Sequence, residues 1–403
     1  LPPAGVDVLQ ARHRVGVGGI ELEQALERLY AEGESWAELD GVLAAELAWA
    51  PPAEHVTLRY RRAELRARHL GDRPGAIDLL EEVVAAQPGH ADGRELLEEQ
   101  LRDPSQRLRV AKVLEPLYLR DQLWKDLAGV LRIQRERAAG PEAALLLGRV
   151  AMIEERELDL GKAAFDTWAQ ALAADPGAPE PQAAILRLAA TYDRWHDAAV
   201  AFDAAATAAG GALAIAVPLR QHVAEICDQS LGDNPRAIAA YRALIALDPG
   251  DVERLGPALA ALARLHEDEE QWPELRAVIA RQAELAGPRR VEFLARAAEL
   301  DEQRLGEPDR AIATWREVLA DVPDHPAALA NLERLYQARD RWRDFAGLLR
   351  HKVDLADLPA ARIAELRRLA EVHEVMLAEP GEAIAAHLEV LDHAGDDTGA
   401  LAG

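Results

Sequence analysis

The stretch Leu305-Gly306-Glu307-Pro308-Asp309-Arg310-Ala311-Ile312 is followed by Trp315 and then by Val322-Pro323. A close copy, Leu231-Gly232-Asp233-Asn234-Pro235-Arg236-Ala237-Ile238, comes earlier and has Tyr241 and Asp248-Pro249 at the same offsets. Looser copies begin at Leu70-Gly71, Leu160-Gly161 and Leu377-Ala378. A block that returns about every 72 residues indicates a stack of similar units, so the repeat predicts the fold better than the total length does.

Two series of landmarks give the size of this unit. The prolines Pro176, Pro249 and Pro323 are 73 and 74 residues apart, and the tryptophans Trp195, Trp272 and Trp342 are 77 and 70 residues apart. The tryptophans mark a second pair of helices within each unit. The spacing therefore predicts two helical hairpins of roughly 36 residues in each unit, a length typical of helix–turn–helix repeats.

One unit shows why its segments are expected to be helical. Apolar residues at helical spacing predict helices over 288–304, from Pro308 through Leu319, over 326–336, and from Trp342 onward. Gly306 supplies the left-handed conformation that commonly ends a helix, and Pro308 fits the first turn of the next one. Each helix has one apolar stripe and a charged back, so it must be covered by its neighbours.

The composition agrees with an all-α fold. The chain has 403 residues, of which 49% are hydrophobic, 29% charged and only 4% aromatic. Residues with high helix propensity dominate, and the residues that favour strands are few. We therefore predict an α-solenoid of about 20 helices that spans residues 21–403. Residues 1–20 are expected to be irregular, and an inserted helix is expected near 102–119, because Pro88 and Pro176 are 88 residues apart.

Charge and cysteine content limit the partners. The net charge is −24 and the pI is near 4.9, which disfavours nucleic acid and anionic membranes as principal partners, although local arginine patches could bind anions. The single cysteine, Cys227, is expected to be a small buried hydrophobic residue. No stretch is apolar enough for a transmembrane helix.

The source and location are less constrained. Lysine occurs only four times against many arginines, which is typical of a GC-rich bacterial genome. The chain begins Leu1-Pro2-Pro3 without an initiator Met, so it is expected to be a processed product or a piece of a longer one. A cytoplasmic location is slightly favoured, and export remains open.

The second helix of each repeated block resembles the tetratricopeptide repeat family. That family has Gly, Ala five residues later, a large aromatic residue four further on, and Pro eight beyond it. The matching sets are Gly232, Ala237, Tyr241 and Pro249; Gly306, Ala311, Trp315 and Pro323; Gly71, Ala76, Leu80 and Pro88; and, with a shortened turn, Gly161, Ala164, Trp168 and Pro176. The hairpins of Trp195, Trp272 and Trp342 match only loosely. The resemblance covers most of residues 20–395. It implies a right-handed superhelix of antiparallel hairpins whose concave face, lined by the first helix of each hairpin, binds peptides or protein surfaces, with no catalytic residues.

The sequence contains no pattern of a catalytic, cofactor or metal site. His373, His387 and His393 gather near the C-terminus, but His387 occupies the repeat position of Tyr241 and Trp315, which favours packing over metal binding. The acidic run Glu267-Asp268-Glu269-Glu270 is expected to be a solvated turn. Gly16-Val17-Gly18-Gly19 follows no strand, so a nucleotide site is not indicated.

Two other residue types have structural interpretations. Serine is scarce, and Ser35 and Ser105 are expected to cap helices rather than act as nucleophiles. The recurring tryptophans are expected to pack between helices. Trp49 and Trp124 fall outside their series, so exposure of either would favour a ligand site.

Three classes of function remain. The favoured one is a non-enzymatic scaffold that binds partner proteins or peptides along an acidic surface, with basic partners favoured. The alternative is a self-assembling protein that associates through the solenoid ends. An enzyme with a site built in the groove is the third and least favoured class. The sequence does not identify ligand-binding residues.

Overall fold

The structure is a computed structural model that describes residues 20–247 and 252–394. The N-terminal segment predicted to be irregular therefore lies outside the described residues, apart from Ile20, and so does the landmark Pro249. All the regular elements in these two ranges are helices, 21 of them from α2 to α22, and consecutive helices pack on one another. The prediction of an all-α solenoid with about 20 helices is confirmed.

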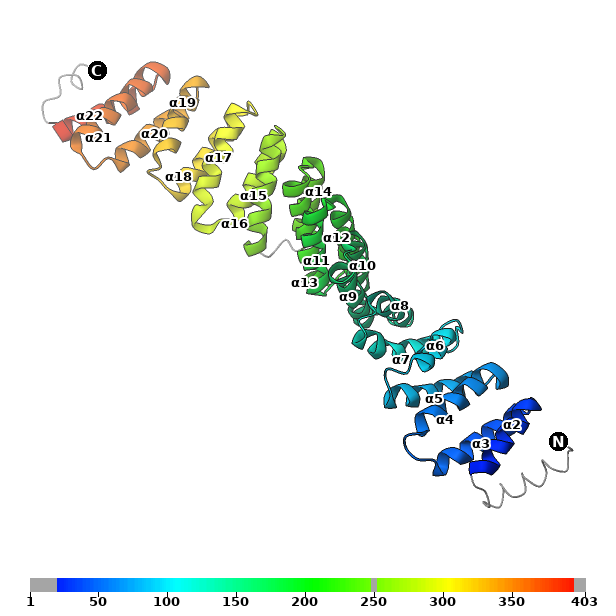
Figure 1. Ribbon diagram of the computed structural model, residues 1–403. Helices are drawn as coiled ribbons and strands as arrows, with labels where there is room; N and C mark the ends of the chain where they lie inside the picture. Colours follow the sequence, from blue (N-terminus) through cyan, green and yellow to red (C-terminus); the bar gives the residue numbers. More distant parts are fainter. Residues whose placement is uncertain (1–19, 248–251, 395–403) are drawn as a thin grey trace. The chain divides into compact units, whose positions relative to one another are not determined.

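Contacts divide the chain into two compact units, Leu1–Leu219 and Arg220–Gly403, which we describe separately (Figure 1). The first contains α2 (Ile20–Glu32), α3 (Trp36–Trp49), α4 (His55–Leu65), α5 (Arg73–Ala86), α6 (Ala91–Gln100), α7 (Arg107–Arg120), α8 (Trp124–Arg135), α9 (Gly140–Arg156), α10 (Gly161–Ala174), α11 (Pro179–Tyr192) and α12 (Trp195–Ala209). Helix α13 (Leu213–Glu225) contains the division point. The second unit contains α14 (Asn234–Leu247), α15 (Val252–Asp268), α16 (Trp272–Leu285), α17 (Arg290–Gln303), α18 (Pro308–Asp321), α19 (Pro326–Ala338), α20 (Trp342–Leu355), α21 (Pro359–Glu371) and α22 (Pro380–Ala394).

Four short helical segments extend or precede these helices. The π-helical turns η1 (Arg66–Leu70), η2 (Ile226–Ser230) and η4 (Val372–Met376) end α4, α13 and α21 respectively. The 3₁₀ turn η3 (Gly287–Arg289) leads into α17. Each π-helical turn stands where the first helix of a hairpin ends at a tight turn.

The first kind of turn, here called the Gly-type turn, occurs five times. In each, a residue with positive φ lies two positions before the next helix: Gly71, Asp159, Gly232, Gly306 and Ala378. The following N–H bonds back across six residues, as when Glu307 donates to the Asp301 carbonyl at 2.7 Å. The same bond joins Asp72 to Arg66, Leu160 to Glu154, Asp233 to Cys227 and Glu379 to His373. The bond spans one residue more than the 6→1 bond of a Schellman motif, and it satisfies a carbonyl at the end of the first helix.

The second kind, the Trp-type turn, also occurs five times. A positive-φ residue again lies two positions before the helix (Glu34, Gln122, Asp193, Glu270 and Asp340), and the helix then begins at Trp36, Trp124, Trp195, Trp272 and Trp342. The residue in between bonds back across five residues, as when Arg341 donates to the Tyr336 carbonyl at 2.9 Å. Trp124 therefore belongs to the tryptophan series, and the prediction that set it apart is wrong. The Trp49 side chain lies outside the described residues.

The two kinds of hairpin alternate along the described chain, which confirms a long unit made of two unequal hairpins. One register needs correction. Gly161 is not the turn glycine of a shortened turn, because Asp159 holds the positive φ and Gly161 begins α10. Counted from Asp159, the alanine, aromatic and proline positions fall at the same offsets as in the other Gly-type hairpins. A Cβ at Gly161 would lie 2.0 Å from the Tyr192 hydroxyl, so glycine is needed there for close packing.

Two helices, α6 and α7, stand between Pro88 and Trp124, where each later unit has one. Helix α7 falls in the stretch where the sequence indicated an inserted helix. However, α7 leads into the turn before Trp124, so it is the first helix of a Trp-type hairpin. The shorter α6 is the additional element of this unit.

The core repeats with the turns. The alanine five residues after each positive-φ residue of the Gly-type turns is buried, and the large residue four further on is buried in four of the five hairpins, as Leu80, Trp168, Tyr241 and Trp315. His387, the fifth, is partly buried. Trp315 is 0% exposed and is the largest fully buried side chain of the described residues. The predicted packing role of these positions is confirmed at those four residues.

Candidate functional site

A groove of about 530 Å³ lies between α15, α16 and α17 in the second unit. One wall is a stripe on α15 that contains Gly256, Ala260 and Ala263, which share one face because they are spaced by three and four residues. Phe293 on α17 forms part of the opposite wall. The small residues on α15 leave the space that larger side chains would fill.

The floor of the groove comes from the end of α16. Leu285 and Ala286 line it together with Leu259 of α15, so the floor is apolar. Gln282 is the polar exception. The residue lines the groove and is only 8% exposed, and its Oε1 atom is buried without a hydrogen-bond partner. A buried polar atom without a partner costs about 1–3 kcal/mol, so this glutamine has free energy to gain from a ligand that supplies a partner.

Charged residues surround the groove but are already paired. Arg296 donates to Glu267 at 2.7 Å, and Arg264 reaches Asp228 at 2.6 Å. Hydrogen bonds to Asp228 raise the pKa of Arg264. Arg289 pairs with Glu292 at 3.0 Å, and its guanidinium lies 5.6 Å from the centre of the Phe293 ring. Each guanidinium is balanced by a carboxylate, so the groove does not select strongly for a charged ligand.

The Arg296–Glu267 pair belongs to a ladder of bridges between first helices of neighbouring hairpins. In every rung the arginine comes from the later helix and the carboxylate from the earlier one, counting η2 with α13. The rungs are Arg61–Glu27, Arg149–Glu115, Arg187–Glu155, Arg264–Asp228, Arg296–Glu267, Arg334–Glu302 and Arg368–Glu333. These arginines are partly exposed, so each rung contributes at most about 1 kcal/mol. The ladder helps to fix which first helices adjoin.

Two buried ionic centres occupy equivalent repeat positions. Asp301 is 0% exposed, accepts from Arg276 Nε at 3.0 Å, and lies 3.4 Å from the Thr314 hydroxyl. Glu154 accepts from Arg132 at 2.5 Å and from Thr167 at 2.6 Å. In both hairpins the carboxylate lies five residues before the positive-φ position, and the threonine lies eight residues after it. Since their partners are close and specific, these centres hold helices together and leave no open site.

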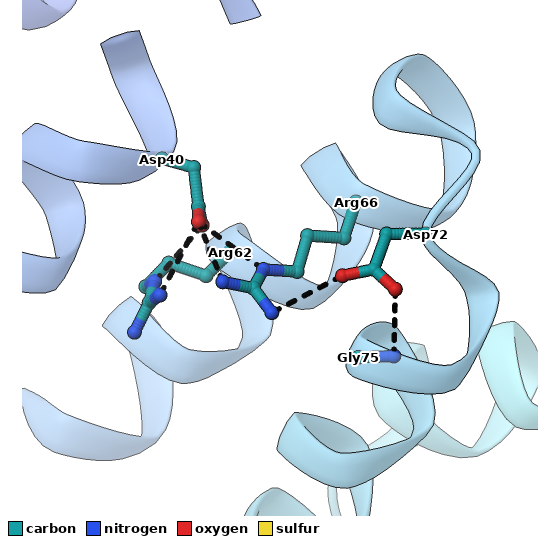
Figure 2. A network of polar contacts seen from close by, with 5 residues as sticks. All are labelled: Asp40, Arg62, Arg66, Asp72 and Gly75. Carbon is teal, nitrogen blue, oxygen red and sulfur yellow. Dashed lines mark hydrogen bonds and ion pairs between the residues drawn. The ribbon is translucent and has the colours of Figure 1, made fainter. Parts of the chain in front are cut away.

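A third buried carboxylate, Asp40 on α3, joins two hairpins of the first unit. Figure 2 shows Arg62 and Arg66 converging on it, with distances of 3.0 Å from Arg62 Nε and 2.7 Å from Arg66 Nη2. Arg66 also donates to Asp72, which caps α5 by accepting from the Gly75 amide. Burial raises the pKa of Asp40, but the hydrogen bonds from the two arginines outweigh it and hold the pKa below its usual value.

A second hollow, of about 380 Å³, lies between α18, α19 and α20. Arg316 lines this hollow and already has partners, because it donates to the Tyr336 hydroxyl at 2.7 Å and pairs with Asp344. The other polar groups of the lining also have partners, since Arg343 pairs with Glu379 at 3.2 Å and His351 lies 2.7 Å from the Pro323 carbonyl. The α15–α17 groove, in contrast, has an unpaired buried amide, so we treat it as the candidate site.

Other residues singled out from the sequence have structural positions. Cys227 is buried in η2, as predicted. Ser35 stands at the N-cap position of α3 but makes no side-chain cap bond. The prediction for Ser105 is wrong, because α7 begins at Arg107 after Gln106 and Asp103 instead accepts from the Ser105 amide.

The acidic run is only partly a turn. Glu267 and Asp268 belong to the last turn of α15, while Glu269 and Glu270 follow it. All four are exposed, and Glu267 serves as a rung of the ladder. The histidines do not gather as a site: His373 pairs with Glu379 at 3.1 Å, and His393 is exposed. Within the two described ranges, no group of three or more His, Cys, Asp or Glu residues could hold a metal ion.

Sequence reasoning missed Gln282 and the ladder. The sequence contained a signal for the ladder, because the arginine and the carboxylate of each rung are 29 to 36 residues apart, close to one hairpin length. Gln282 had no such signal, since a glutamine in a helix normally predicts an exposed surface.

None of the helices in the described part of the chain has the length and apolarity needed to cross a membrane. No protein-family model matches this chain, and no curated protein matches it.

Proposed function

We propose that this protein is a non-enzymatic scaffold of the tetratricopeptide type that binds a segment of a partner protein in the α15–α17 groove. The observation that carries the proposal is the groove itself: about 530 Å³, within the range of roughly 300–1,000 Å³ typical of ligand sites, with an apolar floor and one unpaired buried amide. Grooves between packed helices commonly receive peptide segments through apolar contacts.

The groove's own chemistry favours binding over catalysis. Glu267 is the only carboxylate among the lining residues, and it is engaged with Arg296 in holding α15 to α17. The lining offers no histidine, serine or cysteine to act as a base or nucleophile. Outside the groove, the net charge of −24 favours basic regions of the partner, which would steer association without entering the groove.

The experiment combines capture with mapping. The full chain, immobilised, is used to retain a partner, and amide hydrogen exchange of the chain is then measured with and without that partner. Protection is expected in residues 256–267 and 286–296, because these segments line the groove. Protection confined to other helices, or a chain that retains no protein at any salt concentration, would contradict the proposal.

Self-association is a second candidate, and one observation favours it. Ile384 on α22 is 55% exposed, whereas the residues at the same repeat position, Ile77, Phe165, Ile238 and Ile312, are at most 7% exposed. Leu388, one turn further along α22, is 56% exposed. Sedimentation velocity over a hundredfold range of about 1–100 μM tests this candidate, since a second copy that covers this face requires concentration-dependent dimers. A constant sedimentation coefficient, unchanged in Ile384→Glu, would exclude it.

A further inference from the structure

The groove's unusual feature is an amide that has no partner where apolar walls surround it. Gln282 lines the groove together with Leu259, Leu285 and Phe293, and none of these side chains can hydrogen-bond to its buried Oε1 atom. A glutamine amide carries one acceptor and one donor group. A ligand group that reaches Gln282 must therefore bring a polar atom on an apolar body, because everything else on the floor is apolar.

The charged residues at the rim of the groove further limit which ligand groups fit. Three guanidinium groups stand around the groove, on Arg264, Arg289 and Arg296, which disfavours a lysine or arginine side chain there. Each already has a carboxylate partner, which removes most of the attraction for an acidic side chain. An uncharged side chain of the partner therefore fits these paired charges best.

We infer that the groove receives a tyrosine side chain from the partner segment, with the ring against Phe293 and the phenol hydroxyl on the amide of Gln282. This inference rests on the proposed function and adds which side chain of the partner segment the groove binds. A tyrosine has a large apolar ring and a hydroxyl that both donates and accepts, so it satisfies Gln282 once the amide turns toward the groove. Phe293 provides an aromatic partner, and the small residues on α15 provide the space.

Tyrosine and phenylalanine differ only by the hydroxyl, so they form a matched pair for the test. The probes are the capped pentapeptides acetyl-Ala-Ala-Tyr-Ala-Ala-amide and its Phe and Lys counterparts, with dissociation constants measured on the full chain by ligand-observed NMR. The Tyr peptide is expected to bind about fivefold tighter than the Phe peptide, because one buried hydrogen bond separates them. Equal affinities, tighter binding of the Lys peptide, or no binding of the Tyr peptide would overturn the inference.

The variant Gln282→Leu separates the hydrogen bond from the fit of the ring. It has similar volume and no polar atom, so the preference for Tyr over Phe is expected to fall to about one while the Phe peptide still binds. Gln100→Leu is the matched control, since Gln100 is also 8% exposed but lies on α6 in the other unit. It is expected to leave the preference unchanged. Thermal melting checks that both variants fold.

These outcomes are distinct from those that test the proposed function. If a partner protects the groove from hydrogen exchange but the Tyr preference persists in Gln282→Leu, the groove binds a partner through another anchor and the inference fails alone. If no partner protects the groove, the proposed function fails, whatever the peptides show.

Discussion

Replacing Trp315 by alanine is expected to destabilise the second unit by about 3–5 kcal/mol, the range observed for removing a large buried aromatic side chain. Trp315 is 0% exposed and packs in a core that extends from α16 to α22. Urea unfolding followed by circular dichroism measures the loss. Because the chain has two compact units, we expect the transition of the second unit to move to lower urea while that of the first stays in place.

Two substitutions serve as controls for this prediction. Trp342→Ala removes the same side chain from a partly exposed position in the same unit, so its cost is expected to be smaller. Trp315→Phe keeps much of the ring contact and removes an indole N–H that has no hydrogen-bond partner, so it should cost far less than alanine. Equal losses for Trp315→Ala and Trp342→Ala would show that burial at this repeat position does not hold the unit together.

The second large effect is expected at Asp301. Asp301→Asn keeps the shape of the side chain but removes its charge, which leaves Arg276, only 11% exposed, without its partner. Breaking a buried ion pair in this way costs about 3–5 kcal/mol, because one buried charge is then uncompensated. Urea unfolding of the second unit measures this loss.

Glu302→Gln is the matched control, one residue further along α17. Glu302 bridges to Arg334 at the surface, where a pair contributes at most about 1 kcal/mol. A double variant, Asp301→Asn with Arg276→Met, is expected to recover part of the loss, since neither charge then remains buried. If Asp301→Asn lowered the free energy of unfolding no more than Glu302→Gln does, the buried ion pair would not hold the second unit together.

The repeat predicted most of the fold, because turn residues and apolar spacing are local signals. Glycine at a positive-φ turn is visible in a sequence, so Gly232 and Gly306 were placed correctly. Asp159 was missed, because positive φ is uncommon for residues other than glycine and Gly161, two residues later, offered the usual turn residue. Trp124 was misjudged although its spacing fits the series, since it lies 71 residues before Trp195.

The candidate site could not be predicted from one sequence. Gly256, Ala260 and Ala263 have the ordinary spacing of a helix face, and only the position of α17 opposite them makes a groove. Gln282 is 8% exposed and lines the groove with Leu259 of α15 and Phe293 of α17, so its surroundings come from helices far apart in the sequence. Burial in a stacked array depends on the neighbouring hairpin, so local pattern identifies the core of each helix but not the space left between hairpins.

The most direct test of the central claim fills the groove without changing its charge. The partner retained by the chain is titrated against the wild type, against Ala260→Trp, and against Ala277→Trp, a control at an exposed alanine of α16 outside the groove. The Ala260 variant is expected to bind at least about tenfold more weakly, a loss of about 1.4 kcal/mol, while the Ala277 variant binds as the wild type does. Equal dissociation constants for all three proteins would contradict a docking site between α15 and α17.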